Sequence, residues 1–229
     1  LTLDLDTLTY RPNKKASFAT LELTKTIEKP IDRFKVLVTG KDKAGDFYRK
    51  NFASMFQYCS NRIPEITDAF YKIDDAMKAG FGWENGPFEI WDAIGVEKGI
   101  ELMKAEGFQP ASWVTDMLAS GNTSFYSVKD GATHFYSITN KKVEKIPGQD
   151  AFIILNNIRE SKKIWNNSDS IITDLGDGII NLEFTSKMNS IGAGVLQGIN
   201  KAIDMAEKDY NGLVIGNQGA NFSVGANLG

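Results

Sequence analysis

The amino-acid sequence predicts a multi-domain α+β protein, with a mainly helical domain, then a β-hairpin, then an incomplete α/β unit. Three observations predict this architecture. Apolar residues recur at helical spacing from residue 42 to about residue 120, and the period changes to two between residues 122 and 147. The end of the chain is dense in glycine, with 10 of the 21 glycines in residues 176–229. These changes of pattern divide the chain into segments 1–40, 41–120, 121–150, 151–169 and 170–229.

Residues 1–40 are a lead-in segment without a clear period. They contain Pro12 and Pro30, which we expect to interrupt regular structure, and one short helical candidate, Phe18–Thr26. A domain seldom begins with about 40 residues of weakly patterned chain. We therefore expect this segment to wrap onto another part of the protein.

Residues 41–120 predict a series of helices. The longest candidate spans Phe47–Arg62, and Pro64 is expected to begin a second helix that continues through Phe70. A short helix from Lys72 is expected to end at Gly80 in a left-handed C-cap. The remaining candidates are Phe88–Ala93, two short helices punctuated by Gly95, Gly99 and Gly107, and Ala111–Ala119.

Residues 121–150 predict a β-hairpin, because two alternating stretches flank the turn Asp130-Gly131. A third strand is expected near Val143. Residues 151–169 are interpreted as a connector with one helical turn around Ile158–Ile164.

Residues 170–229 predict the beginning of an α/β unit. Strands Ser170–Leu175 and Ile179–Thr185 are joined at Asp177-Gly178, and the long amphipathic helix Asn189–Asp209 follows. Leu213–Ile215 is expected to be a short buried strand that leads into a glycine-rich loop. Because the pattern starts at a leucine and stops in this loop, we expect the chain to be a fragment of a longer protein.

Composition excludes several kinds of chemistry. The formal net charge of -3 argues against nucleic-acid binding, and no apolar run approaches the roughly 18 residues that a membrane span needs. Cys59 is the only cysteine and His134 the only histidine, which excludes intramolecular disulfides, thiolate zinc clusters and His-rich metal sites. We interpret His134 as a half-exposed strand residue, and the lone thiol is typical of a reducing, cytoplasmic setting.

Residues 73–96 resemble the C-terminal helical domain of 3-hydroxyacyl-CoA dehydrogenases. The hallmark D-x-A-M-x-x-G-x-G-x-x-x-G-P-F-E is present in register from Asp74 to Glu89. In that family the helix corresponding to Phe47 onward carries a catalytic asparagine, and ungapped counting places Arg49 there. The family's nicotinamide-binding half is absent. The resemblance therefore implies a second, degenerate copy of the helical domain, in which Trp83, Phe88 and Trp91 are core or interface residues.

Residues 175–228 resemble the start of a crotonase, or enoyl-CoA hydratase/isomerase, domain. The first helix there begins with N-A-L, where this chain has Asn189-Ser-Ile, and the loop pattern A-F-x-A-G-A-D-L corresponds to residues 221–228. A dehydrogenase domain followed by a hydratase domain is the order of one group of bifunctional fatty-acid β-oxidation proteins. Together the two resemblances cover about residues 12–229.

The crotonase resemblance implies one catalytic group in this chain. The backbone N–H of Ala226 would donate to the oxyanion of an acyl-CoA thioester, with Gly225 permitting the turn and Ser223 lying close to the substrate. Lys187 and Asn189 flank a loop that in the family runs beside CoA, although a solvated lysine and a helix N-cap asparagine are the simpler interpretations. The second oxyanion amide and both acid/base glutamates of the family lie beyond Gly229.

Two hypotheses about function stay open. In the first, the parent protein hydrates 2-enoyl-CoA and oxidises 3-hydroxyacyl-CoA with NAD. The NAD-binding domain is absent from this sequence, and the rest of the same polypeptide is the expected partner of this chain. In the second, the chain is a non-catalytic scaffold or oligomerisation module, and on its own we expect it to be inactive. The segment Gly192–Gly198 superficially resembles a dinucleotide fingerprint, but its spacing is wrong and it lies at a helix start.

Overall fold

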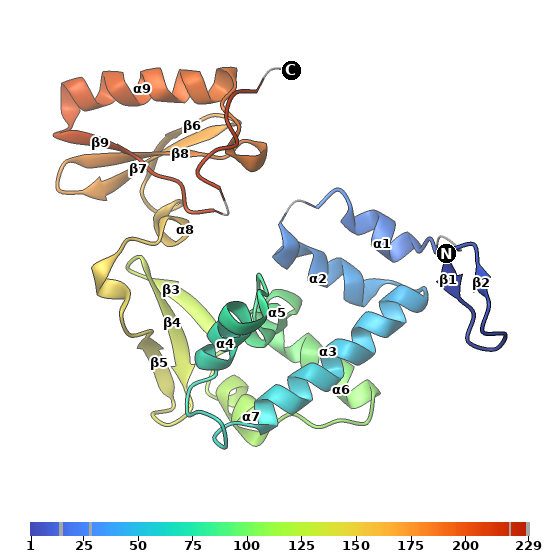
Figure 1. Cartoon of the computed structure of the whole chain (residues 1–229). Helices are drawn as coiled ribbons and strands as arrows, with labels where there is room; N and C mark the ends of the chain where they lie inside the picture. Colours follow the sequence, from blue (N-terminus) through green and yellow to red (C-terminus); the bar gives the residue numbers. More distant parts are fainter. Residues whose placement is uncertain (14–15, 28, 220, 228–229) are drawn as a thin grey trace. The chain divides into compact units, whose positions relative to one another are not determined.

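The computed structural model describes residues 1–13, 16–27, 29–219 and 221–227, and the chain forms two compact units (Figure 1). One unit comprises Leu1–Tyr126 with Phe135–Glu144, and the other comprises Ser127–His134 with Lys145–Gly229. The chain contains both helices and β-sheets, which confirms the α+β class. The five segment boundaries stay predictions.

The first unit is mainly helical (Figure 1). It begins with a two-stranded antiparallel ribbon and continues through seven helices in the described residues. Their bounds are β1 Thr2–Leu3, β2 Tyr10–Arg11, α1 Ala19–Thr24, α2 Pro30–Thr39, α3 Lys43–Asn61, α4 Tyr71–Phe81, α5 Pro87–Ile94, α6 Val96–Ala105 and α7 Ser112–Ala119.

The core of the helical unit is a cluster of aromatic rings. Trp91 is fully buried, its ring stacks on Phe56 with centroids 4.7 Å apart, and its indole Nε1 donates to the carbonyl of Val96 at 3.0 Å. Phe70 and Phe88 are also fully buried, with centroids 5.0 Å apart. Rings of this size dominate the apolar area that a small core removes from water.

Three expectations for the helical unit are wrong. Pro30 does not interrupt the chain but occupies the first turn of α2, where its missing N–H costs no hydrogen bond. No helix begins at Pro64, because residues 62–70 form turns and the Thr67 hydroxyl accepts from the N–H of Ala69 at 3.3 Å. The left-handed cap of α4 is Gly82 (φ 66°) rather than Gly80.

A three-stranded sheet follows, with strand order β3-β4-β5. Its strands are β3 Tyr126–Lys129, β4 Ala132–Ser137 and β5 Lys142–Lys145, so the hairpin and the third strand are confirmed. His134 is a half-buried residue of β4, as expected. The division between the two units runs through this sheet.

The second unit contains a four-stranded sheet, with strand order β6-β7-β8-β9, and the long helix α9 lies on one side of it (Figure 1). β6, β7 and β8 are antiparallel, and β9 pairs with β8 in parallel. The elements are η1 Gln149–Ala151, α8 Leu155–Ile158, β6 Lys163–Asn166, β7 Ser170–Gly176, β8 Ile179–Phe184, η2 Lys187–Asn189, α9 Ala193–Asp209 and β9 Gly212–Ile215.

The core of this unit lies between α9 and the sheet. Alternate residues of β8, Ile180, Leu182 and Phe184, pack with Val195 and Ala202 of α9. Such an alternation is expected of a strand with one face on a helix.

Sequence reasoning missed strand β6, and it wrongly expected a buried last strand. Val214 and Ile215 of β9 are 44% and 42% exposed, because β9 is the outermost strand in the sheet order. No helix in the described part of the chain has the length and hydropathy that a membrane crossing requires.

Candidate functional site

The candidate site is the loop that follows β9. Gly225 has φ 94°, a conformation that L residues rarely adopt, and its N–H donates to the Ser223 hydroxyl at 3.0 Å. A side chain at Gly225 would be strained even though the space around it is open. The glycine therefore permits the turn, as the sequence predicts.

The Ala226 N–H is held without a hydrogen-bond partner in the described part of the chain. Ile191 forms a parallel bridge with Ala226: its N–H donates to the carbonyl of Gly225 and its carbonyl accepts from the N–H of Asn227, both at 2.9 Å. Gly225 and Asn227, which make these two contacts, flank Ala226. In a parallel pairing, the residue between them directs its own N–H to the opposite side. The bridge thus fixes the backbone and leaves the Ala226 N–H directed away from Ile191, available to an acceptor.

The structure brings Asn189 and Ser223 to this loop and leaves Lys187 exposed beside it. The Asn189 side chain donates to the carbonyl of Asn221 at 2.9 Å. The expectation that Asn189 caps a helix is wrong, because its φ is 55° and α9 begins only at Ala193. Asn189 instead holds the loop from the side of η2.

Sequence reasoning missed two carboxamides that anchor the start of the loop. Asn217 accepts from the N–H of Phe184 at 2.7 Å and donates to the carbonyl of Phe222 at 2.6 Å. Gln218 accepts from the N–H of Leu155 at 2.7 Å and donates to the carbonyl of Ile153 at 2.6 Å. Two adjacent carboxamides after a strand, in a stretch otherwise made of glycine and small residues, were the available signal.

The one carboxylate on β8 is already paired. Glu183 is 4% exposed, and both of its oxygens accept from the guanidinium of Arg159, at 2.7 and 3.0 Å. A bidentate pair of this kind occupies both oxygens of the carboxylate. Glu183 is therefore a structural residue and not a free acid or base.

In the helical unit, the hallmark motif builds a buried hydrogen-bond network. Asp74, fully buried, accepts from the backbone N–H groups of Phe88 and Glu89 at 2.9 and 3.0 Å and from the hydroxyl of Tyr126 at 2.7 Å. The Glu89 carboxylate in turn accepts from the N–H of Gly86 at 2.8 Å. These contacts satisfy the free N–H groups at the start of α5.

A second buried carboxylate joins α5 to the start of β3. Asp92 accepts from the backbone N–H groups of Phe125 and Tyr126 at 2.7 and 2.8 Å. Burial raises the pKa of both Asp74 and Asp92 to about 7, while the donated hydrogen bonds act in the opposite direction. The geometry gives these carboxylates a structural role, because their oxygens face main-chain donors inside the core.

Arg49 occupies the place of the catalytic asparagine that the dehydrogenase resemblance implies. Its guanidinium donates to the carbonyl of Val38 at 3.2 Å and to the carbonyl of Gly40, at the end of α2. A cation at a helix C-terminus is favourable. The side chain at this position thus fastens α2 to α3.

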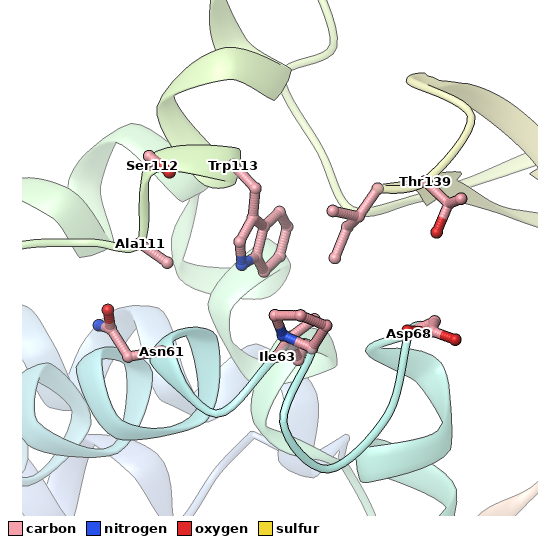
Figure 2. Close-up of a pocket in the computed structure, with 9 residues that line it drawn as sticks. Asn61, Ile63, Asp68, Ala111, Ser112, Trp113 and Thr139 are labelled. Atoms are coloured by element: carbon pink, nitrogen blue, oxygen red, sulfur yellow. The ribbon is translucent and has the colours of Figure 1, made fainter.

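The helical unit also contains an open cavity of about 530 Å³, shown in Figure 2. The Trp113 ring forms part of its wall, with Nε1 bonded to the carbonyl of Ser60 at 3.0 Å. Asp68 is the one titratable side chain among its lining residues, so the cavity offers no acid–base pair. The lining residues are Asn61, Ile63, Pro64, Asp68, Ala111, Ser112, Trp113, Ile138 and Thr139.

Neither the lone thiol nor a metal site adds chemistry in the described residues. Burial raises the pKa of Cys59 to about 11, so the thiol stays protonated and unreactive at neutral pH. No group of three or more potential metal ligands is found in the part of the chain that the structure describes.

Comparison with known proteins identifies relatives named for 3-hydroxyacyl-CoA dehydrogenase and for fatty acid oxidation. A Bacillus subtilis protein named "Probable 3-hydroxyacyl-CoA dehydrogenase" is 39% identical over 227 residues, which cover 99% of this chain and 28% of that protein. Proteins of Rickettsia felis and Rickettsia prowazekii, both named "Putative fatty acid oxidation complex trifunctional enzyme", are 26% and 25% identical. Those matches cover 80% and 99% of this chain and 22% and 27% of the relatives. No protein-family profile and no solved structure matches the chain.

The chain therefore spans about a quarter of the length of the curated relatives that it matches. Over 80% to 99% of its length it is similar to a segment of proteins that are named for 3-hydroxyacyl-CoA dehydrogenase or for fatty acid oxidation. This similarity supports the dehydrogenase side of the resemblance. The crotonase side stays a prediction.

Proposed function

We propose that this chain is part of a fatty-acid β-oxidation enzyme that hydrates 2-enoyl-CoA and oxidises 3-hydroxyacyl-CoA with NAD. In this proposal the helical unit is structural, and the loop after β9 supplies one oxyanion donor of the hydratase site. The observation that carries the proposal is the Ala226 N–H, which has no hydrogen-bond partner among the described residues and lies on a backbone fixed by Gly225 and Ile191. The similarity to fatty-acid oxidation proteins supports it.

The proposed role of Ala226 is electrostatic. When water adds to an enoyl thioester, negative charge develops on the thioester carbonyl oxygen. An N–H that is already oriented stabilises this charge without reorganisation, and one such donor contributes roughly 3 to 4 kcal/mol. Glu183 is not available as the acid or the base, because its carboxylate is paired with Arg159, and we propose that both groups come from the rest of the parent protein.

The CoA thioester would lie along the loop. Ser223 lies at the turn beside Gly225, and Asn189 and Lys187 lie on η2 next to it. The exposed ammonium of Lys187 is suited to the phosphates of CoA, as a point charge. These contacts are proposals for the same site.

The segment 192–198 does not fit NAD. Two of its glycines are closely packed: a Cβ on Gly194 would lie 2.1 Å from the Asp169 carboxylate, and one on Gly198 would lie 2.2 Å from the Ser170 hydroxyl. A carboxylate at this place repels a pyrophosphate, and the glycines serve helix–sheet packing. We therefore assign no step of the dehydrogenase reaction to this chain.

The test uses the full-length protein and two variants of Ala226. Ala226→Pro removes the N–H of residue 226. It keeps both hydrogen bonds of the bridge, because these use the carbonyl of Gly225 and the N–H of Asn227. Ala226→Ser keeps the N–H and is the matched control. We expect the proline variant to lower kcat for crotonyl-CoA hydration by about 10² to 10³-fold, the serine variant to have little effect, and both to keep NADH formation from 3-hydroxyacyl-CoA. A full-rate proline variant would refute the role of Ala226, and a parent protein without hydratase activity would refute the proposed reaction.

A scaffold or oligomerisation role is the second candidate for the chain by itself. The observation that favours it is Arg49, which fastens two helices where a catalytic asparagine would stand. We expect the purified 229-residue chain to show no turnover of crotonyl-CoA or of 3-hydroxyacyl-CoA with NAD. Measurable hydration by this chain would contradict the scaffold interpretation.

A further inference from the structure

The sequence contains two Asn-Gly pairs, Asn85-Gly86 and Asn211-Gly212. In such a pair the backbone nitrogen of glycine can attack the side-chain carbonyl carbon of asparagine. The new C–N bond closes a five-membered succinimide, and the side-chain nitrogen leaves as ammonia with the proton lost by the glycine nitrogen. Water then opens the ring at either carbonyl and yields an aspartyl or an isoaspartyl residue. Glycine favours the attack because it has no side chain and turns freely.

Asn211-Gly212 is open to this reaction. Asn211 is exposed, and its side chain has one long hydrogen bond among the described residues, 3.4 Å to the carbonyl of Asp177. The backbone N–H of Asn211 donates to the carbonyl of Gly178 at 2.7 Å, and the register of β8 and β9 pairs the following Gly212 with Ile179. Because β9 is the outermost strand in the sheet order, Asn211-Gly212 lies at the edge of the sheet.

Asn85-Gly86 is closed to it. Gly86 is buried, its N–H donates to the Glu89 carboxylate at 2.8 Å, and its carbonyl accepts from the N–H of Ile90 at 2.9 Å. A Cβ on Gly86 would lie 2.3 Å from the side chain of Asp74, so the backbone has no room to turn. The attack here requires the first turn of α5 to open.

We propose that Asn211 is a site of spontaneous deamidation in the folded protein, and that Asn85, with the same dipeptide, is protected by the fold. The modification removes the amide that donates to the carbonyl of Asp177 and places a carboxylate oxygen against it. The isoaspartyl product also adds a methylene to the main chain before Gly212, where the register pairs Gly212 with Ile179. The damage therefore falls on β9, the strand from which the candidate loop continues.

The test is incubation of the purified chain in mildly alkaline buffer, followed by proteolysis and peptide mass mapping over days. We expect conversion of Asn211 to a mixture of aspartyl and isoaspartyl products, at a rate at least about ten times that of Asn85, because the second reaction must wait for local opening. In concentrated urea the two sites should react at similar rates. Asn211→Gln should abolish the modification, because the longer side chain closes a ring far more slowly, and Asn85→Gln should leave it unchanged.

The effect on β9 is measured by amide hydrogen exchange. The Asn211→Asp variant, which reproduces the aspartyl product, should exchange faster than the parent over residues 212–216. Equal rates at Asn85 and Asn211 in the folded chain would overturn the proposal. So would an Asn211 that reacts in urea but stays intact in the folded chain over the same period.

Discussion

Asp74 offers the sharpest test of how the helical unit is held together. Asp74→Ala would leave the N–H groups of Phe88 and Glu89 and the hydroxyl of Tyr126 without an acceptor inside the core. Each unsatisfied buried donor costs about 1 to 3 kcal/mol, and such costs are not additive within one network. We expect the free energy of unfolding of this unit to fall by about 3 to 5 kcal/mol, a large share of the 5 to 15 kcal/mol typical of a domain.

The neighbouring residue supplies the matched control. Asp75 is one position along the same helix, its side chain is 63% exposed, and it forms only an ion pair with Lys78 at 3.3 Å. Exposed pairs of this kind contribute about 0 to 1 kcal/mol, so Asp75→Ala should have little effect. The assay is urea unfolding of the purified chain, followed by tryptophan fluorescence, because Trp91 lies in the same core. If Asp74→Ala is no more destabilising than Asp75→Ala, the network does not hold the unit together.

Three further predictions follow from burial and packing. The pKa values of Asp74 and Asp92 rise from 3.8 to about 7, so at these two groups the folded state binds more protons than the unfolded state between those pH values. Their contribution to stability should be greatest below about pH 4 and should be lost as the pH rises through 7. Asp92→Asn should flatten this contribution in unfolding measurements. Gly99→Ala places a Cβ 2.0 Å from the Trp91 indole and should lower the melting temperature. Gly80→Ala lies in a helix, where the new Cβ meets nothing within 4 Å, and should stabilise the protein by about 0.5 to 1 kcal/mol. A higher melting temperature for Gly99→Ala than for Gly80→Ala would contradict the packing. Arg159→Ala leaves the buried carboxylate of Glu183 without its partner and should lower the free energy of unfolding by about 3 to 5 kcal/mol. Chemical denaturation of the second unit measures this loss, and a loss below about 1 kcal/mol would refute the prediction.

Periodicity predicted most of the regular elements and failed where a local contact decided the outcome. The helix around Phe52 and Phe56 and the turn at Asp130-Gly131 were predictable, because apolar spacing and turn chemistry agree there. Pro30 was misjudged because proline interrupts a helix interior but suits the first turn, and the sequence does not show which position it occupies. Strand β6 was missed because Ile164 and Trp165 are adjacent in it, so Lys163–Asn166 shows no alternation of polar and apolar residues.

The candidate site was predictable only in part, for a similar reason. The resemblance pointed to Gly225 and Ala226, and the positive φ of the glycine agrees with that expectation. One contact that fixes the loop comes from Ile191, about 35 positions away in the sequence. The others come from the side chains of Asn217 and Gln218, whose partners the sequence does not identify. Long-range hydrogen bonds of this kind follow from the fold and not from local pattern.

The discontinuity of the helical unit has a consequence for synthesis. Its core includes Phe135, whose ring meets Phe70 and Tyr71 at centroid distances of 5.8 and 4.7 Å, although about 65 residues separate them in the chain. A nascent polypeptide therefore cannot complete this core when α7 has left the ribosome, because the strand with Phe135 has not yet emerged. Until residues 135–144 arrive, the partly formed helices expose an aromatic surface, and this interval is the one in which we expect a chaperone to bind the growing chain.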